Sequence, residues 1–240
     1  MLVRPCDYSL RQVVRNNTRR TQHQQGFHIV FVLASSSSLD CSEMIDQENK
    51  QFGDILQFNH PDGYHFITLS VFHSFHYIQK LHLPIQYVVK TDSDCVVNYN
   101  SLHKRVDSID AARQNEVYMG RCWYNVSYNY KTNSSKTYVP KELLRDRDFI
   151  PYFAAGGCYV FSYRLLPRLL LALQHLPFIA HSEDVNVGKG MIMLNIPCIG
   201  DEKWWIARHG CSSRDECLKY VVMHPNVSSE DTIRFYSYLN

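Results

Sequence analysis

Residues 87–98 constrain the fold of this chain more than any other segment. They begin with the apolar run Tyr-Val-Val, which is typical of a buried strand, and then reach two carboxylates, Asp92 and Asp94. Side chains two residues apart in an extended segment point to the same side, so two like charges there repel unless a cation or a proton lies between them. Such oxygen ligands suit Mg²⁺ or Mn²⁺ together with substrate phosphates. Taken alone, the motif is more often a solvated turn, and it needs a second signal.

Two later stretches supply that signal. Gly156 and Gly157 precede the apolar run 159–161, and adjacent glycines let the backbone approach a ligand closely. Glu183 and Asp184 stand where a helix begins, and the helix dipole alone would also favour acids there. A cation on a diphosphate stabilises a negative leaving group, and a separate carboxylate can take the proton from an attacking hydroxyl. The combination predicts glycosyl transfer from a nucleotide sugar.

Strand patterns alternate with helical patterns along the chain. An early continuous apolar run is typical of a strand buried on both faces, and apolar side chains recur at helical spacing over residues 64–80. Residues 7–24 predict a short helix or turn, residues 124–148 a long surface excursion, and the tail after Gly200 irregular structure. The alternation predicts one α/β domain over residues 1–240, with a mostly parallel central sheet.

Charge and metal-ligand patterns exclude some classes of protein. The formal net charge is +2 and no basic run is long, so nothing indicates a nucleic-acid partner. The 12 histidines are scattered and the 8 cysteines form no Cys-x-x-Cys pair, so neither residue type predicts a zinc site. The pairing of the cysteines stays open, although Cys211 and Cys217 are close enough to close a small loop.

The cysteines and the glycosylation sequons favour the lumen of the secretory pathway. Asn-x-Ser/Thr sequons stand at Asn16, Asn125, Asn133 and Asn226. The first residues carry no apolar signal region, and no run reaches transmembrane length. Either the protein is cytosolic, or these residues lack a natural amino-terminal portion.

Six segments in order resemble the motifs of a known family. They are residues 11–18, 48–56, 62–69, 90–98, 149–162 and 183–188. Lys-Thr-Asp-Ser-Asp at 90–94 is similar to the family's Lys-x-Asp-Asp-Asp, and Glu-Asp-Val-Asn-Val-Gly at 183–188 is similar to its Glu-Asp-Val-Tyr-Val-Gly. The family is that of the inverting β1,3-glycosyltransferases, which includes Golgi β1,3-galactosyl- and β1,3-N-acetylglucosaminyltransferases.

The resemblance implies a GT-A fold, which is a Rossmann-like nucleotide-sugar-binding fold, with a UDP-sugar donor, Mn²⁺ and a glycan acceptor on a glycoprotein or glycolipid. It implies that Asp94 binds the metal, and that Asp92 contacts the ribose or the metal shell. Asp184 would be the catalytic base, supported by Glu183. The other residues that it places at the substrate are Arg11 and Arg15, near the uracil or diphosphate, and Gly156 and Gly157, which would line the sugar pocket.

The sequence also departs from the family pattern. Ser93, Cys158 and Asn186 replace an Asp, a Gly and a Tyr, and only Leu2 and Val3 remain of the first strand. We therefore expect that the chain lacks the anchor, the stem and most of that strand, and that membrane association in the Golgi comes from a segment absent here. The alternative is a catalytically silent relative that acts as a glycan-binding or chaperone protein.

Overall fold

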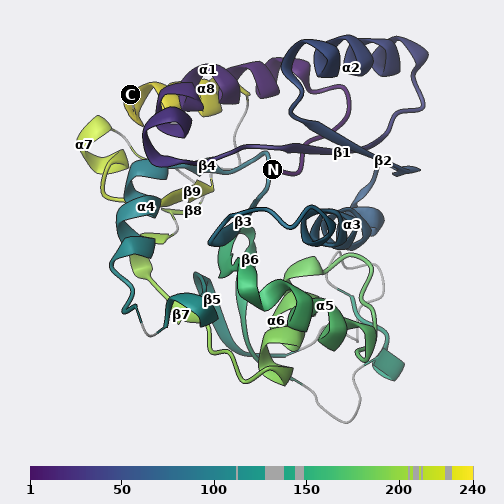
Figure 1. Ribbon diagram of the computed structural model, residues 1–240, viewed down its shortest axis with the longest axis vertical. Coiled ribbons are helices and arrows are strands. Elements are labelled where there is room, and N and C mark those ends of the chain that lie inside the picture. Colours follow the sequence, from purple (N-terminus) through teal and green to yellow (C-terminus); the bar gives the residue numbers. More distant parts are fainter. Residues whose placement is uncertain are drawn as a thin grey trace. The chain divides into compact units, whose positions relative to one another are not determined.

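The computed structural model describes residues 1–111, 113–127, 138–143, 149–204, 206–207, 211, 213–224 and 229–239. Its helices and strands form two compact units, and the chain passes between them several times (Figure 1). The first unit comprises Met1–Asp62, Lys90–Ala111 and Asp201–Asn240, and the second comprises Gly63–Val89 and Ala112–Gly200. A single catalytic domain over residues 1–240 stays a prediction.

The first unit contains helices from both ends of the chain. Its helices are α1 (Tyr8–Gln25), α2 (Leu39–Phe52), α4 (Tyr99–Asp107), α7 (Arg214–Cys217) and α8 (Ser229–Leu239). Its strands are β1 (Phe31–Ser35), β2 (Ile55–Pro61), β4 (Val96–Val97), β8 (Ile206–Ala207) and β9 (Val222–His224). The helix among the two alternatives for residues 7–24 is confirmed as α1, which is longer than expected. The irregular tail was wrong, because the described residues after Gly200 are largely helix and strand.

Residues 1–3 occupy the place of the first strand. Leu2 forms parallel bridges to Val32 of β1 and to Asp92, which follows β3. The Leu2 N–H donates to the Thr91 carbonyl at 2.9 Å, and the Val3 N–H donates to the Val32 carbonyl at 3.1 Å. The reduced strand that the sequence predicts thus joins β1 to the segment that carries the Asp-x-Asp motif.

The core of the first unit is shared by α1, α2, β1 and the tail. Buried apolar side chains meet there, among them Val14, Phe31, Ile45, Met223 and Phe235. Disulfides Cys6–Cys41 and Cys211–Cys217 lie in this unit, and Cys122–Cys198 lies in the second. Cys95 and Cys158 are buried and lie outside the disulfides.

The second unit is a sheet with helices packed on it. Its helices are α3 (Ile67–Lys80), α5 (Leu166–Gln174) and α6 (Glu183–Met193). Its sheet has the order β3 (Tyr87–Thr91, which continues into the first unit), β6 (Phe149–Ser162), β5 (Tyr118–Ser127) and β7 (Ile199–Gly200). The helix expected over residues 64–80 is confirmed as α3, which follows the 3-10 turn η1 (Tyr64–Phe66).

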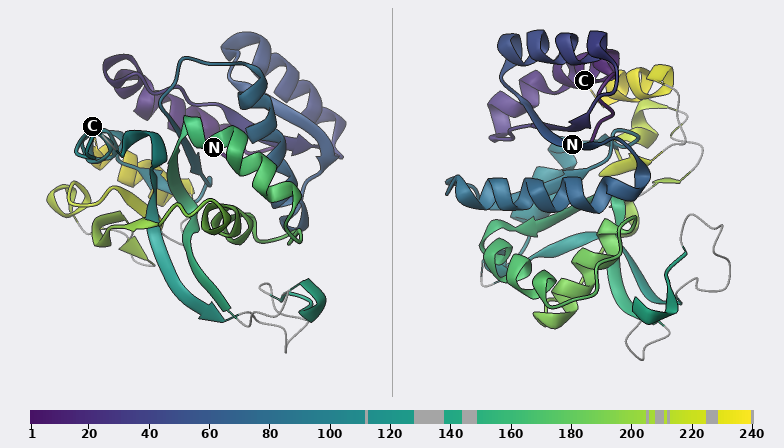
Figure 2. Two further views of the ribbon diagram at one scale, coloured as in Figure 1. Left: turned by 60° about the horizontal axis from the view of Figure 1, so that its bottom comes forward. Right: turned by 90° about the vertical axis from the view of Figure 1, so that its right-hand side faces the viewer.

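A long antiparallel hairpin of β5 and β6 dominates this sheet, drawn in teal and green in Figure 2. Its pairing extends from Tyr118 opposite Phe161 to Ser127 opposite Phe149. Residues 124–127 are therefore strand, whereas the sequence predicted surface excursion there, and most of the remaining excursion lies outside the described residues. Helix α6 packs so closely on β6 that a Cβ on Gly188 would clash with the Phe153 Cβ.

Among the described residues, no helix combines the length and the apolar character needed to cross a bilayer.

Candidate functional site

The Asp-x-Asp motif lies in a tight turn at the end of β3. The strand ends at Thr91, and the Cys95 N–H donates to the Asp92 carbonyl at 3.2 Å. The expectation that Asp92 and Asp94 point the same way from an extended segment was therefore wrong. Each carboxylate has its own cationic partner, because the turn separates the two side chains.

These partners come from different strands of the first unit. The Lys90 Nζ lies 2.7 Å from Asp92 Oδ1, and the Lys90 side chain is 4% exposed. The His224 Nε2 lies 3.2 Å from Asp94 Oδ2. His224 reaches this position because β9 pairs antiparallel with β4, which sets Met223 opposite Val96. Sequence reasoning missed His224, since it lies in the tail that was expected to be irregular.

Asp94, Cys95 and His224 form a group that we call the cation cluster. One ligand atom from each residue lies within 4.8 Å of the other two, a spacing that can hold a metal ion. The Cys95 Sγ lies 3.7 Å from Asp94 Oδ1. The side chains of Asp94 and His224 are 54% and 26% exposed, whereas Cys95 is 1% exposed. The cluster is therefore open to solvent on the Asp94 side and closed at the sulfur.

Charge in the cation cluster is distributed between an acid and a histidine. Burial opposes ionisation of Asp94, but the hydrogen bond from His224 and the charges of His224 and Lys90 hold its pKa below the ordinary value. The same hydrogen bond raises the pKa of His224 against the effect of its partial burial. Without a bound cation, the pair therefore favours a carboxylate beside an imidazolium.

The arginines predicted at the donor are held in a buried ion-pair network. The Arg11 side chain is 1% exposed, and its Nη2 bonds Glu48 at 2.5 Å. Arg15 bonds Glu48 through Nη1 and Asp54 through Nη2, at 2.5 Å and 2.6 Å. The network ties α1 to α2 and to the start of β2. Contact of Arg11 or Arg15 with the uracil or diphosphate stays a prediction.

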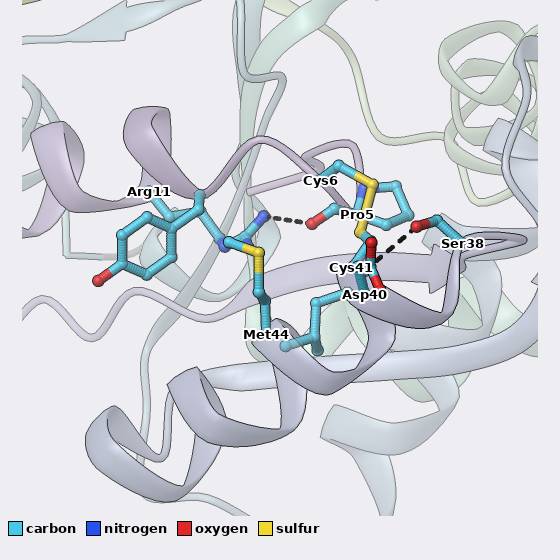
Figure 3. Close-up of a pocket in the computed structure, with 9 residues that line it drawn as sticks. Pro5, Cys6, Arg11, Ser38, Asp40, Cys41 and Met44 are labelled. Carbon is cyan, nitrogen blue, oxygen red and sulfur yellow. Dashed lines mark hydrogen bonds between the residues drawn. A yellow bond between two sulfur atoms is a disulfide. The ribbon is translucent and has the colours of Figure 1, made fainter.

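Arg11 also stabilises the amino-terminal turn. Its Nη1 donates to the Pro5 carbonyl at 2.9 Å, beside the Cys6–Cys41 disulfide (Figure 3). A small pocket at this place has Met44 of α2 among the side chains that line it (Figure 3). Arg11 also lines this pocket, whereas no residue of the cation cluster does.

The second unit brings Glu183 and Asp184, the acid pair, against the glycines of β6. Asp184 Oδ2 accepts from the Gly156 N–H at 3.0 Å, and Asp184 Oδ1 accepts from the Val185 N–H at 2.8 Å. Glu183 is 3% exposed, and its Oε2 accepts from the Tyr159 hydroxyl at 2.9 Å. The structure thus fixes the orientation of both carboxylates and leaves Asp184 partly exposed.

A bulge in β6 creates this contact. Gly120 pairs with Tyr159 and Cys122 pairs with Ala154, so residues 155–158 stand opposite one residue of β5. Bulges break the ladder and redirect the backbone. Here the bulge turns the Gly156 N–H toward Asp184, and a Cβ on Gly156 would lie 2.8 Å from a Glu183 carboxylate oxygen. Gly157 lies buried in the same bulge; contact of either glycine with a sugar stays a prediction.

Two buried tyrosines support the acid pair. Burial, and then the Glu183 charge, raise the pKa of Tyr159. Burial likewise raises the pKa of Tyr118, whose oxygen accepts from the Ala154 N–H at 2.8 Å. Tyr159 therefore stays protonated and donates to Glu183, so the buried acid is held by a neutral donor.

A histidine also lies near Asp184. The His181 ring is 6.3 Å from the His65 ring and 6.2 Å from the Tyr64 ring. Burial and the nearby His65 lower the pKa of His181, which favours the neutral ring. Its Nε2 is buried and has no hydrogen-bond partner among the residues that the structure describes. Sequence reasoning did not select His181, because a lone histidine before a helix carries no specific signal.

Comparison with known proteins defines the class of the chain as a glycosyltransferase with the GT-A fold. The structure resembles the crystal structure of the galactosyltransferase LgtC in complex with donor and acceptor sugar analogs, with a TM-score of 0.50 and 10% identity. The match covers 98% of this chain and 94% of LgtC. It confirms the predicted α/β fold class, whose parallel pairs here include β1 with β2 and β5 with β7.

The chain belongs to the Galactosyltransferase family, whose sequence pattern matches residues 10–202. It is 25% identical over 237 residues to the β-1,3-galactosyltransferase 1 of Mus musculus and to that of Homo sapiens. These matches cover 96% of this chain and 70% of each relative. The β-1,3-galactosyltransferase 2 of Homo sapiens is 25% identical over 243 residues, which cover 98% of this chain and 56% of that protein. The predicted family is thereby confirmed.

Proposed function

We propose that this protein transfers a hexose or N-acetylhexosamine from a UDP-sugar to a hydroxyl of a glycan, with inversion, forming a β1,3 linkage. The acceptor glycan would be carried by a glycoprotein or a glycolipid. Membership of the Galactosyltransferase family supports glycosyl transfer, and the names of the relatives favour galactose as the sugar. The observation that carries the proposal is the fixed, partly exposed carboxylate of Asp184.

Asp184 would act as the general base. Backbone N–H groups hold both of its oxygens, so the carboxylate is oriented before the substrate arrives. It would take the proton from the acceptor hydroxyl, whose oxygen then attacks the anomeric carbon of the donor. One displacement at that carbon inverts its configuration. Glu183 would keep Asp184 in place from its buried contact with Tyr159.

Asp94 and His224 would bind the divalent cation. Carboxylate oxygen suits Mn²⁺ and imidazole is the commonest metal ligand among side chains, so the residues present can hold the metal that the family resemblance implies. When bound, the cation would stabilise the negative charge on the departing UDP. Asp92 would contact the ribose or a water in the metal shell. The ammonium of Lys90 already stabilises the Asp92 carboxylate.

We also propose that the enzyme works in the lumen of the Golgi, held to the membrane by a segment outside these residues. Three disulfides in one chain suit an oxidising compartment. The sequons at Asn16 and Asn125 lie among the described residues. Mass spectrometry of the secreted domain would detect glycans attached to these asparagines.

Calorimetric titration of UDP into the purified protein tests the proposal. We expect binding in Mn²⁺ that disappears after a chelator is added, followed by transfer when UDP-sugars and glycan acceptors are screened. A folded protein that binds no UDP in Mn²⁺ would overturn the proposal. That result would favour the alternative, a catalytically silent relative. The departures from the family pattern at Ser93, Cys158 and Asn186 motivate this alternative.

A further inference from the structure

We propose that the thiolate of Cys95 is a third ligand of the cation site, and that the site therefore prefers Zn²⁺ or Co²⁺ to Mn²⁺. The inference rests on the proposed cation site and deepens it. Asp-x-Asp motifs offer oxygen ligands, and no pattern in the sequence predicts a sulfur ligand beside them. The structure adds it because the turn at residues 92–95 and the β4–β9 pairing bring oxygen, sulfur and nitrogen together.

Two of the spacings in the cluster approach those around a tetrahedral metal. Zinc bonds to sulfur at about 2.3 Å and to nitrogen or oxygen at about 2.0–2.1 Å, which places neighbouring ligand atoms about 3.3–3.6 Å apart. The Cys95 Sγ lies 3.7 Å from an Asp94 oxygen, and the His224 Nε2 lies 3.2 Å from the other. Small rotations of these side chains would be enough to close the cluster around one ion.

The chemistry of the ligand set decides which ion is preferred. Thiolate is a soft ligand that selects zinc and related metals, whereas Mn²⁺ and Mg²⁺ favour oxygen. Three protein ligands with an open fourth position are typical of catalytic zinc sites. The exposed side of Asp94 leaves room for a water or a phosphate oxygen, while Cys95 closes the buried side. Zn²⁺ and Mn²⁺ would then compete for one site.

Cobalt spectroscopy tests this inference directly. Co²⁺ is titrated into the wild-type protein in a buffer free of thiols and chelators, and we expect a near-ultraviolet thiolate-to-cobalt band that saturates at one equivalent. Zn²⁺ should abolish the band at one equivalent, whereas Mn²⁺ should need a large excess. Cobalt binding without such a band would overturn the inference.

The two cysteines outside the disulfides provide the matched variants. The six other cysteines form disulfides, so the band can come only from Cys95 or Cys158. We expect Cys158→Ser to keep the band and Cys95→Ser to lose it. Cys95→Ser should also weaken Zn²⁺ binding by more than about 100-fold, since even outer-shell partners are worth 10–100-fold. If Cys95→Ser fails to fold, loss of the band in Cys158→Ser would still refute the assignment.

Failure of this inference and failure of the proposed function give different results. If Mn²⁺-dependent UDP binding is seen but Zn²⁺ binds Cys95→Ser and wild-type protein equally, only the role of Cys95 is wrong. If the cobalt band appears but no metal supports UDP binding, the metal site is real and the proposed function is wrong.

Discussion

The acid pair of the second unit and the Asp92 and Asp94 carboxylates of the first unit are held by opposite means. Cationic side chains, Lys90 and His224, contact the two aspartates of the first unit. The acids of the second unit accept from a tyrosine hydroxyl and from backbone N–H groups, all of them neutral donors. Both regions are short acidic motifs in the sequence, but their surroundings suit them to different chemistry.

The difference shows how surroundings assign roles to like residues. A carboxylate paired with a cationic side chain can exchange that partner for a metal ion, because both partners carry the same sign of charge. A carboxylate oriented by neutral dipoles keeps its full negative charge available for a proton from the acceptor. The first arrangement suits cation binding, and the second suits general base catalysis.

The largest expected effect separates these two roles. Asp184→Asn keeps the shape of the side chain but cannot accept a proton, so transfer should fall by about 10²–10⁴-fold. Mn²⁺-dependent UDP binding should stay unchanged, because the cation ligands lie in the first unit. The measurements are an initial-rate assay and a calorimetric titration.

Asp46→Asn is the matched control for Asp184→Asn, since it makes the same change at an exposed position on α2. It should leave both the rate and the titration unaltered. If Asp184→Asn transferred the sugar at the wild-type rate, Asp184 would not be the base, and the contrast between the two regions would be wrong.

A stability effect of about 3–5 kcal/mol is expected at Glu48, the acid most completely paired with cations. Glu48→Gln leaves two buried arginines with reduced compensation, so the urea midpoint should fall strongly, whereas Glu43→Gln on the exposed face of α2 should not move it. Burial opposes the charge of Glu48, but Arg11 and Arg15 hold its pKa below the ordinary value of 4.5.

The pH dependence of the same variant has a defined sign. A lowered folded-state pKa contributes stability that is complete above 4.5 and is lost as the pH falls through the lowered value. Wild-type protein should therefore lose more stability than Glu48→Gln over that acid range. Parallel curves for the two proteins would show that the pKa of Glu48 is the same in the folded and unfolded states, which would contradict its stabilisation by Arg11 and Arg15.

Tyr159→Phe removes the neutral hydroxyl that donates to Glu183. It should lower the free energy of unfolding by about 1–3 kcal/mol, because it leaves a buried carboxylate with one donor fewer. Chemical denaturation measures the loss. The transfer rate should fall less than in Asp184→Asn, since Tyr159 acts only through Glu183. A Tyr159→Phe enzyme as inactive as Asp184→Asn would mean that Glu183, and not Asp184, carries the essential charge.

The sequence predicted the fold class and the positions of the acidic motifs well, because these depend on local patterns. Alternating strand and helix patterns and the ordered family motifs are readable without any pairing information. The β6 bulge was not readable, since Gly156 and Gly157 indicated close approach but not which groups approach. The strand also extends well before the apolar run at 159–161, because the whole of Phe149–Ser162 is one strand.

The cation cluster could be predicted only in part. Asp94 follows a recognisable strand, but Cys95 and His224 become neighbours only through the antiparallel pairing of β4 with β9. No local pattern encodes that pairing, because both strands are very short. For Arg11 and Arg15 the family motif suggested substrate contacts, which stay a prediction, and it did not indicate that each guanidinium bonds an acid from α2.

The smallest expected effect concerns the fit between the bulge and the acid pair. Gly156→Ala places a Cβ 2.8 Å from a Glu183 oxygen, whereas Gly200→Ala places one no closer than 3.4 Å to Cys122. Because the blocking atom ends a side chain, Gly156→Ala should cost only about 1 kcal/mol of stability, the low end for overpacking. The displaced acid pair should still lower the transfer rate more than Gly200→Ala does. Equal transfer rates for the two variants would show that catalysis tolerates this shift of the acid pair. The neutral donors would then matter more because they leave the carboxylates charged than because they orient them.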